Sequence, residues 1–332
     1  MNYYIAIDHG GTKTRAVVFN EHGLIEFSCD DALLLKSGIR NNYNWHERID
    51  CLKKSIDLFM DKKGAKCSYL MISLNGVNSI ADIKKAEQVL QAKIKTKQFK
   101  VVSDIFAALR GCELYGVENT PSIVLCAGSG LNCAISKGGK KVKALGWRIG
   151  VQDQGGYAIG RKIWDASVDD YNGFGKSTIL LQLLLSYYKR KSFGRLIDDI
   201  SKGIIRFAPE EFALLLFEAV MLNDIKANEI MNETVERWLR YICLLVNESN
   251  LNSLDSINLY LSGGLFNERS GLLKRALLQK AQNLYNNFRI RDALLPPIGG
   301  AALLLLDKKY NKIIPPSIAD VFLHSFMSQE IR

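Results

Sequence analysis

The sequence predicts an α/β protein of two domains, and three observations carry this prediction. Short apolar runs typical of buried strands alternate with longer amphipathic stretches typical of helices. A strand–glycine turn–strand pattern occurs twice, at residues 5–19 and 123–136. The chain has 332 residues, which is more than one typical domain needs. The repeated hairpin indicates that the second domain repeats the opening of the first.

The first half of the chain begins with three strands and continues with helices between further strands. The glycine turn joins the first two strands, and polar residues bound the others. The predicted strands cover residues 3–7, 15–20, 24–28, 69–74 and 99–102, and the predicted helices cover residues 46–61, 81–94 and 104–114. Strands separated by helices favour a partly parallel sheet.

The second half is richer in helix. Its predicted strands are residues 123–126, 131–136 and 257–261, and its predicted helices are 156–168, 178–190, 209–246, 268–286, one from near Ala301, and 317–328. We expect one domain over residues 1–117 and a second over 118–311. The C-terminal segment, about residues 312–332, is expected to pack on the first domain.

Composition narrows the function classes. Hydrophobic residues make up 48% of the chain and charged residues 23%, as in ordinary globular proteins. The net charge is +10, but the lysines are scattered over polar positions of helical patterns. This distribution favours a solvated basic surface that attracts anionic substrates mildly, and no nucleic-acid partner is expected.

The cysteines indicate a reducing compartment. The chain has seven, no pair is spaced C-x-x-C, and no Cys/His cluster has the spacing of a zinc site. We also find no basic leader followed by an apolar segment and no apolar run long enough to cross a bilayer. The expectation is a cytoplasmic protein without a membrane partner.

The first glycine turn carries the clearest chemistry. Residues 8–14 read Asp-His-Gly-Gly-Thr-Lys-Thr between two apolar runs. Glycines let an anion approach the main chain, and successive N–H groups in such a turn form an anion-binding concavity. The residues expected to hold phosphate are Gly10, Gly11, Thr12, Lys13 and Thr14. Asp8 fits beside them if Mg²⁺, which it would hold through water, lies between. The plain alternative is a glycine hairpin without a ligand.

A second glycine turn and a third follow later strands. Gly128, Ser129 and Gly130 separate the two strands of the second hairpin, and Gly263 and Gly264 follow the strand at 257–261. Two such hairpins, facing each other across a cleft, could hold one polyphosphate between them.

Together these motifs resemble a known superfamily. Residues 8–14 resemble the first phosphate motif of the sugar kinase/Hsp70/actin superfamily, residues 127–133 its second phosphate motif, and residues 261–265 its adenosine motif. The stretches 146–150 (Gly-Trp-Arg-Ile-Gly), 153–160 (Asp-Gln-Gly-Gly-Tyr-Ala-Ile-Gly) and 297–303 (Pro-Ile-Gly-Gly-Ala-Ala-Leu) are similar to the N-acetylglucosamine kinase and BadF/BadG-type ATPase branch. The resemblance runs from about residue 3 to 306.

The resemblance implies two ribonuclease H-like domains of the sugar kinase/Hsp70/actin (ASKHA) type. ATP would lie in the interdomain cleft with the sugar deeper, and the domains would close on binding. The implied activity is an ATP- and Mg²⁺-dependent kinase acting on a hydroxyl of an amino sugar, N-acetylglucosamine or a related N-acetylated hexosamine such as N-acetylmuramate. The implied assembly is a homodimer, for which the apolar stretch 209–246 is either a surface or internal core.

Asp104 matches the catalytic acid of this family. It stands where a strand ends and a helix begins, and the helix N-terminus would favour its ionised form. A carboxylate there can accept the proton of a sugar hydroxyl as that hydroxyl attacks the γ-phosphate. The alternative is that Asp104 is only a helix N-cap.

The residues expected to contact the sugar match the family's motifs less closely. The resemblance places Gly146, Trp147 and Asp153 near sugar hydroxyls, and Asn132 and Asn41 at further sugar positions. Asp153 could instead be a helix N-cap, and Asn132 a turn asparagine.

Residues 153–156, Asp-Gln-Gly-Gly, depart from the family's usual Asp-Glu-Gly-Ser. The change removes a carboxylate and a hydroxyl near the substrate, which leaves the identity of the sugar open. Losing a negative charge would ease the entry of a carboxylated sugar such as N-acetylmuramate.

The sequence also suggests three other interpretations. Residues 175–178, Gly-Lys-Ser-Thr, look like the end of a P-loop, but no strand precedes them, so we reject that interpretation. A BadF-type ATPase that activates a partner enzyme would need cysteine ligands for an iron–sulfur cluster, and Cys126 and Cys133 lie inside the second phosphate hairpin. A non-catalytic sugar-binding regulator would not need both Asp8 and Asp104.

Overall fold

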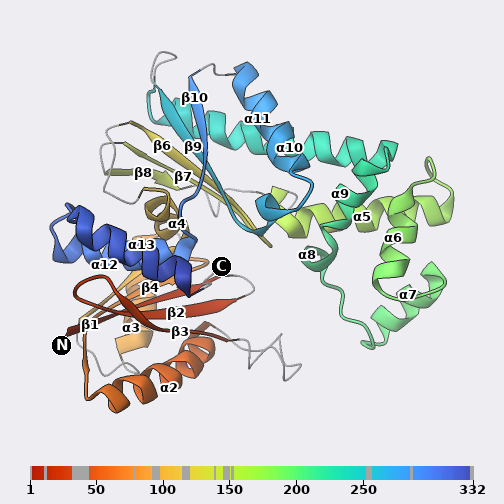
Figure 1. The fold of residues 1–332 in the computed structure, drawn as a ribbon. Helices are drawn as coiled ribbons and strands as arrows, with labels where there is room; N and C mark the ends of the chain where they lie inside the picture. Colours follow the sequence, from red (N-terminus) through yellow and green to blue (C-terminus); the bar gives the residue numbers. More distant parts are fainter. Residues whose placement is uncertain are drawn as a thin grey trace. The chain divides into compact units, whose positions relative to one another are not determined.

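The structure is a computed structural model. It describes residues 2–10, 13–31, 45–77, 79–91, 98–113, 120–137, 140–144, 150, 153–251, 256–284 and 287–329. Within these ranges it contains two five-stranded sheets with helices between and around the strands (Figure 1). The α/β prediction is confirmed.

The first sheet is mixed. Its strands are β1 (Asn2–His9), β2 (Thr14–Asn20), β3 (Ile25–Asp30), β4 (Lys66–Leu74) and β5 (Phe99–Ser103), in the order β3-β2-β1-β4-β5. β1 pairs antiparallel with β2 across the glycine turn and parallel with β4, which in turn pairs parallel with β5. The carboxyl ends of β1, β4 and β5 therefore meet at one edge.

The second sheet repeats this order. Its strands are β6 (Ser122–Ala127), β7 (Leu131–Lys137), β8 (Lys140–Ala144), β9 (Ile257–Ser262) and β10 (Phe288–Asp292), in the order β10-β9-β6-β7-β8. Taken from the other side, the order β8-β7-β6-β9-β10 matches β3-β2-β1-β4-β5 strand for strand. The duplication inferred from two glycine hairpins thus extends to all five strands, including β8 and β10, neither of which the sequence predicted.

Helices cover both faces of the first sheet (Figure 1). Successive residues of β1 alternate between the two faces, so Ile5 and Ile7 join one core and Ala6 the other. The first core lies under α2 (Trp45–Lys63) and α3 (Ile80–Gln91). The second lies under α4 (Asp104–Gly111), α12 (Pro297–Lys309) and α13 (Pro316–Ser328).

The helices of the second half are α5 (Gly155–Asn172), α6 (Ile179–Tyr187), α7 (Phe193–Ser201), α8 (Pro209–Phe212), α9 (Leu215–Met221), α10 (Ile225–Glu248) and α11 (Leu272–Leu284), with a 3-10 turn η3 (Gly264–Asn267) before α11. Helix was predicted over 209–246 without internal boundaries, and the structure divides that stretch into α8, α9 and α10. Asn223, in the left-handed conformation with a φ of 59°, interrupts the helical path between α9 and α10. The Asp224 carboxylate then caps α10 by accepting a hydrogen bond from the Ala227 N–H at 2.7 Å. α7 was not predicted, and α12 begins at Pro297 rather than near Ala301.

Contacts divide the chain into two units. Unit 1 comprises Met1–Val124, Ala134–Ala144 and Arg291–Arg332, and unit 2 comprises Leu125–Cys133 and Leu145–Ile290. The C-terminal helix α13 packs within unit 1, where the Ser325 hydroxyl accepts from the Ile25 N–H at 3.2 Å and Phe322 contacts Phe19. The sequence-based domains, 1–117 and 118–311, remain a prediction. None of the described helices is both long and apolar enough to cross a membrane.

Candidate active site

One edge of the first sheet collects the acidic candidates of unit 1. Asp8 of β1 lies opposite Ser73 of β4, and Leu74 of β4 lies opposite Ser103 of β5, the residue before Asp104. Neighbouring strands are about 4.8 Å apart, so the backbones of Asp8 and Asp104 lie roughly 10 Å apart along this edge. The parallel register thus brings together two carboxylates that are 96 positions apart in the sequence.

Asp8 is held in a half-buried, acidic environment. Its Oδ1 accepts a hydrogen bond from the buried Ser73 hydroxyl at 2.6 Å. Burial and the charge of Asp104 raise the pKa of Asp8 to about 7, while the hydrogen bond from Ser73 opposes the rise. Ser73 was not predicted as a site residue. Its only signal in the sequence is its position near the end of a strand that precedes Asn75-Gly76.

Asp104 is the first residue of α4, and Ser103 is the N-cap residue. The alternative that Asp104 is an N-cap is therefore wrong. Its Oδ1 accepts from the Ile105 N–H at 2.7 Å and lies 3.4 Å from the Ser103 hydroxyl oxygen. The N–H donor and the helix N-terminus both favour a carboxylate at this position.

The helix that carries Asp104 is fixed by α12. A Cβ on Gly300 would lie 1.8 Å from the Ala107 carbonyl oxygen, so only glycine lets the two helices approach this closely. The largely buried Arg110 donates from Nε and Nη2 to the two carboxylate oxygens of Asp307 at 2.7 and 2.9 Å. The motif at 297–303 therefore positions α4 and, through it, Asp104.

The first glycine turn is closed by its own main chain. The Gly10 N–H donates to the Lys13 carbonyl at 2.9 Å. Thr14 is fully buried, its Oγ1 lies 2.9 Å from His9 Nδ1, and its N–H donates to Asp31 Oδ1. Lys13 is exposed. The structure therefore uses the Thr14 hydroxyl within the hairpin. Gly11 and Thr12 lie outside the described residues.

The second glycine turn is held by the start of α5. The Gly128 N–H donates to the Gly130 carbonyl at 2.9 Å, the Gly156 N–H to the Gly128 carbonyl at 2.8 Å, and the Tyr157 N–H to the Ser129 carbonyl at 2.9 Å. The first N–H groups of α5 thus support the turn directly. A Cβ on Gly156 would lie 3.1 Å from the Gly128 oxygen, so a serine at this position would crowd the turn.

Two more glycines approach the same turn in conformations that favour glycine. Gly155 has a φ of 43°, and a Cβ there would lie 2.2 Å from the Gly130 oxygen. Gly263 has a φ of 102°, and a Cβ there would lie 2.3 Å from the Ala127 oxygen. The exposed Gly264 follows it and begins η3. The predicted second phosphate motif and adenosine motif therefore lie side by side in unit 2.

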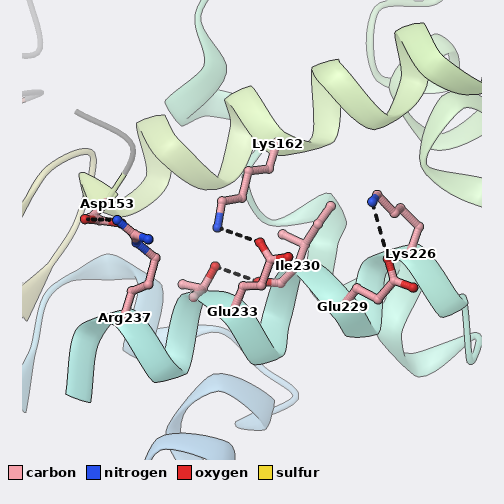
Figure 2. Close-up of polar contacts among 8 residues, drawn as sticks. Asp153, Lys162, Lys226, Glu229, Ile230, Glu233 and Arg237 are labelled. Atoms are coloured by element: carbon pink, nitrogen blue, oxygen red, sulfur yellow. Dashed lines mark hydrogen bonds and ion pairs between the residues drawn. The ribbon is translucent and has the colours of Figure 1, made fainter. Parts of the chain in front are cut away.

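Asp153 is buried and has two protein partners from α10. Arg237 donates to both of its carboxylate oxygens, and the Tyr241 hydroxyl donates to Oδ2 at 2.6 Å. Figure 2 shows the Arg237 contact. The N-cap residue of α5 is Gln154, so the N-cap alternative for Asp153 is wrong. Asn132 accepts from the Cys133 N–H at 3.0 Å through Oδ1. Asn41, Gly146 and Trp147 lie outside the described residues.

The structure supports the rejection of the P-loop. Residues 175–178 follow helix α5 rather than a strand, and the Thr178 hydroxyl caps α6 by accepting from the Leu180 N–H. That hydroxyl also lies 3.0 Å from both carboxylate oxygens of Asp224. Its role is to begin a helix.

A hard divalent cation fits the acidic edge of unit 1. Burial, and to a smaller extent the nearby Asp104 carboxylate, raise the pKa of Asp8, and a bound cation would favour the ionised form of both acids. Among the described residues, no three His, Cys, Asp or Glu side chains cluster as ligands. Mg²⁺ needs no such cluster, because it keeps several waters and takes one or two carboxylates plus substrate phosphates.

The chain is similar to amino-sugar kinases in sequence. It is 24% identical over 278 residues to the N-acetylmuramic acid/N-acetylglucosamine kinase of Clostridium acetobutylicum, covering 80% of this chain and 86% of the relative. It is 24% identical over 324 residues to the N-acetyl-D-glucosamine kinase of Dictyostelium discoideum, covering 92% and 98%.

Solved structures and a family profile complete the comparison. A crystal structure from Chromobacterium violaceum, named as a proposed N-acetylglucosamine kinase, aligns with a TM-score of 0.63 and 16% identity, covering 91% of this chain and 98% of the other. It shares the fold expected from the resemblance. The profile of the BadF/BadG/BcrA/BcrD ATPase family matches residues 5–304. The chain therefore belongs to the BadF/BadG/BcrA/BcrD ATPase family.

Proposed function

We propose that this protein is an ATP-dependent kinase that phosphorylates a hydroxyl of an amino sugar, N-acetylglucosamine or a related N-acetylated hexosamine such as N-acetylmuramate. The observation that carries the proposal is the row Asp8–Ser73–Asp104 at the carboxyl ends of β1, β4 and β5, beside the first glycine turn. The kinases named among its relatives support the sugar class.

Asp104 is the general base of this proposal. Its carboxylate would accept the proton of the sugar hydroxyl while that oxygen attacks the γ-phosphorus of ATP and the β–γ bridging bond breaks, releasing ADP. The Ile105 N–H, 2.7 Å from Oδ1, holds the carboxylate in one orientation.

The glycine turns would hold the phosphates. Gly10, Gly11, Thr12 and Lys13 would form the first site, which the buried Thr14 supports from within the hairpin. Gly128, Ser129 and Gly130 would form the second, and Gly263 and Gly264 would lie against the adenosine. Asp8 would hold Mg²⁺, which supplies charge neutralisation for the phosphates when bound. On the sugar side we propose Asn41, Asn132, Gly146, Trp147 and Asp153.

The proposed compartment is the cytoplasm and the proposed assembly a homodimer. The sequence left open whether residues 209–246 form a dimer surface or core. Val235, Trp238 and Ile242 of α10 are at most 1% exposed and belong to the core, whereas Leu214, Met221, Leu222 and Ile225 of the same stretch are exposed, so both alternatives stay open. The homodimer therefore rests on the family resemblance alone.

An activator ATPase with an iron–sulfur cluster is the main alternative within the family. Its ligands would be thiolates. Cys133 is fully buried, and burial raises the pKa of its thiol well above the ordinary value. A thiol so resistant to ionisation makes the second hairpin a poor cluster site, which favours the kinase.

The test is a coupled ADP-release assay with glucosamine, N-acetylglucosamine, N-acetylmannosamine, N-acetylmuramate and glucose. We expect turnover that depends on an N-acetylated sugar, with ATP hydrolysis alone much slower. ADP release that is the same with and without every sugar would contradict the kinase and favour the activator ATPase.

A further inference from the structure

Asp153 is held by a set of contacts that we call the Asp153 anchor: Asp153 before α5, and Arg237 and Tyr241 on α10. Arg237 Nε donates to Oδ1 and Nη2 donates to Oδ2 at 3.2 Å, so the guanidinium binds both oxygens. The Tyr241 hydroxyl gives a third hydrogen bond, to Oδ2. This arrangement fixes the position and the plane of the carboxylate.

The anchor leaves little accepting capacity. An ionised carboxylate has about four lone-pair sites, and three donors already use the two oxygens. Among the described residues, Oδ2 has two of these donors and Oδ1 one, so the accepting site that they leave is on Oδ1. The Asp153 side chain is only 2% exposed, while that of Arg237 is 39% exposed. Asp153 can therefore accept one further hydrogen bond, and its negative charge is already balanced.

The anchored residue leads directly into the segment that supports the second glycine turn. Gly156 and Tyr157 follow within four positions and donate their N–H groups to Gly128 and Ser129. Asp153 is thus fixed on one side by α10, and the segment after it is fixed by the turn. The backbone position of Asp153 is therefore fixed both by the Asp153 anchor and by the contacts of Gly156 and Tyr157 with the second glycine turn.

Resting on the proposed function, we propose that Arg237 and Tyr241 are positioning residues that hold Asp153 as a charge-balanced acceptor for one sugar hydroxyl. The same charge balance admits a carboxylated N-acetylhexosamine. Gln154 is neutral, and Arg237 balances the charge of Asp153. Residues 153 and 154 together with Arg237 therefore carry no net negative charge. A sugar carboxylate would meet one uncompensated charge if Arg237 were removed.

A matched control lies on the same two helices (Figure 2). Lys162 of α5 and Glu233 of α10 form an ion pair at 3.3 Å, and the Glu233 side chain is 62% exposed. Exposed pairs of this kind contribute little to stability. Glu233→Gln therefore removes an α5–α10 contact one helical turn from Arg237 without touching Asp153.

The experiment measures KM for sugar and for ATP, with N-acetylglucosamine and N-acetylmuramate as probes, in wild type, Arg237→Gln, Arg237→Lys, Tyr241→Phe and Glu233→Gln. Arg237→Gln should raise sugar KM by roughly tenfold or more, and ATP KM by much less, because a buried charge loses its partner. Tyr241→Phe should raise sugar KM by about threefold. Glu233→Gln should change neither.

A second readout separates positioning from general distortion. Arg237→Gln should lower the ratio of kcat/KM for N-acetylmuramate to that for N-acetylglucosamine by roughly tenfold, whereas Arg237→Lys, which keeps the charge, should preserve the ratio. In an Asp153→Asn background, Arg237→Gln should have little further effect on sugar KM, because paired residues are not additive.

Different outcomes separate this proposal from the proposed function. A folded wild type that turns over no sugar overturns both. A wild type active on sugars, whose sugar KM is unmoved by Arg237→Gln and Tyr241→Phe, overturns the anchor alone. The anchor is also overturned if Arg237→Gln raises the KM for sugar and the KM for ATP equally. It is overturned likewise if the effects of Arg237→Gln and Asp153→Asn on sugar KM are fully additive. If the wild type does not phosphorylate N-acetylmuramate, the part of the proposal that concerns a carboxylated sugar is overturned. Tyr241→Phe keeps the test decisive if Arg237→Gln does not fold.

Discussion

Single residues at the ends of three parallel strands set the chemistry of unit 1. Asp8 and Asp104 are close enough for the charge of one to raise the pKa of the other, yet their hydrogen bonds differ. Asp8 accepts from the Ser73 hydroxyl, and Asp104 accepts from the Ile105 N–H at a helix start. In the proposed function the two acids have different tasks: Asp8 would hold a cation and Asp104 would accept a proton.

Asp104→Asn tests the second task. Asparagine keeps the size of the side chain and can still accept from the Ile105 N–H, but it cannot take a proton. We expect kcat for sugar phosphorylation to fall by roughly 10²–10⁴-fold with little change in ATP KM. Steady-state ADP release measures both constants, and a variant within threefold of wild-type kcat would remove Asp104 from its role.

Asp8→Asn tests the environment of Asp8 through pH-dependent stability. The ordinary pKa is 3.8 and the folded value about 7, so the folded state resists ionisation of Asp8. The resulting destabilisation is absent below pH ~4, grows between about pH 4 and 7, and is complete above pH ~7. Without nucleotide or Mg²⁺, Asp8→Asn should raise Tm by about 2–5 °C at pH 8.5 and leave it unchanged at pH 4.

Scanning calorimetry at the two pH values makes the comparison for Asp8→Asn. A gain of the same size at both pH values would mean that the effect does not come from the charge of Asp8. The Ser73 hydroxyl can still donate to the asparagine oxygen, so loss of that hydrogen bond does not confound the result.

The sequence predicted Asp8 from the glycine turn beside it, and Asp104 because it matches the catalytic acid of the family that the chain resembles. Position alone would not have distinguished Asp104 from a helix N-cap. The sequence did not predict Arg237 and Tyr241. They lie 84 and 88 positions beyond Asp153, on a helix whose charged positions look like any solvated face. Only the packing of α10 against α5 brings them to the acid.

At the scale of elements, glycines determine how closely helices and turns approach. Gly155→Ala would place a Cβ 2.2 Å from the Gly130 oxygen at a φ of 43°. The second glycine turn must then move, and we expect ATP KM to rise by roughly tenfold or more while the protein stays folded. Steady-state kinetics against ATP concentration test this expectation.

Gly175→Ala is the matched control for Gly155→Ala. A Cβ on Gly175 would meet nothing within 4 Å, and the residue lies in the rejected P-loop sequence. We expect ATP KM to stay within about twofold of wild type. A rise as large as that of Gly155→Ala would restore the P-loop interpretation and contradict the assignment of the second glycine turn.

Gly300→Ala tests the contact that positions the Asp104 helix. Its Cβ would lie 1.8 Å from the Ala107 oxygen, so α12 and α4 must separate. We expect a loss of about 1–3 kcal/mol in the free energy of unfolding, measured by urea titration. A loss of stability no larger than that of Gly175→Ala would mean that the two helices are not tightly packed.

Strands were predicted more closely than helices for a physical reason. The strands of each sheet are short apolar runs bounded by glycine or polar residues, and these signals are local. The boundaries between α8, α9 and α10 depend on Pro209, on the left-handed conformation of Asn223 and on the Asp224 cap. Apolar periodicity continued across these breaks, so the pattern alone did not show the boundaries.

At the scale of the whole molecule, the chain contains the same five-strand order twice. The sequence revealed this through one hairpin in each half, because glycine turns are recognisable and the remaining strands are not alike. It could not show that α12, which follows the second sheet in sequence, packs with α4 in unit 1. That placement depends on the close approach of Gly300 and on the Arg110–Asp307 pair.

Identification of the product tests the proposed kinase activity most directly. Purified protein, MgATP and N-acetylglucosamine or N-acetylmuramate should yield a sugar phosphate monoester in amounts equal to the ADP released, detected by phosphorus NMR. Asp104→Asn should yield neither product at a comparable rate. Inorganic phosphate in place of a sugar phosphate, with ADP formed at the same rate whether or not sugar is present, would contradict the proposed kinase activity.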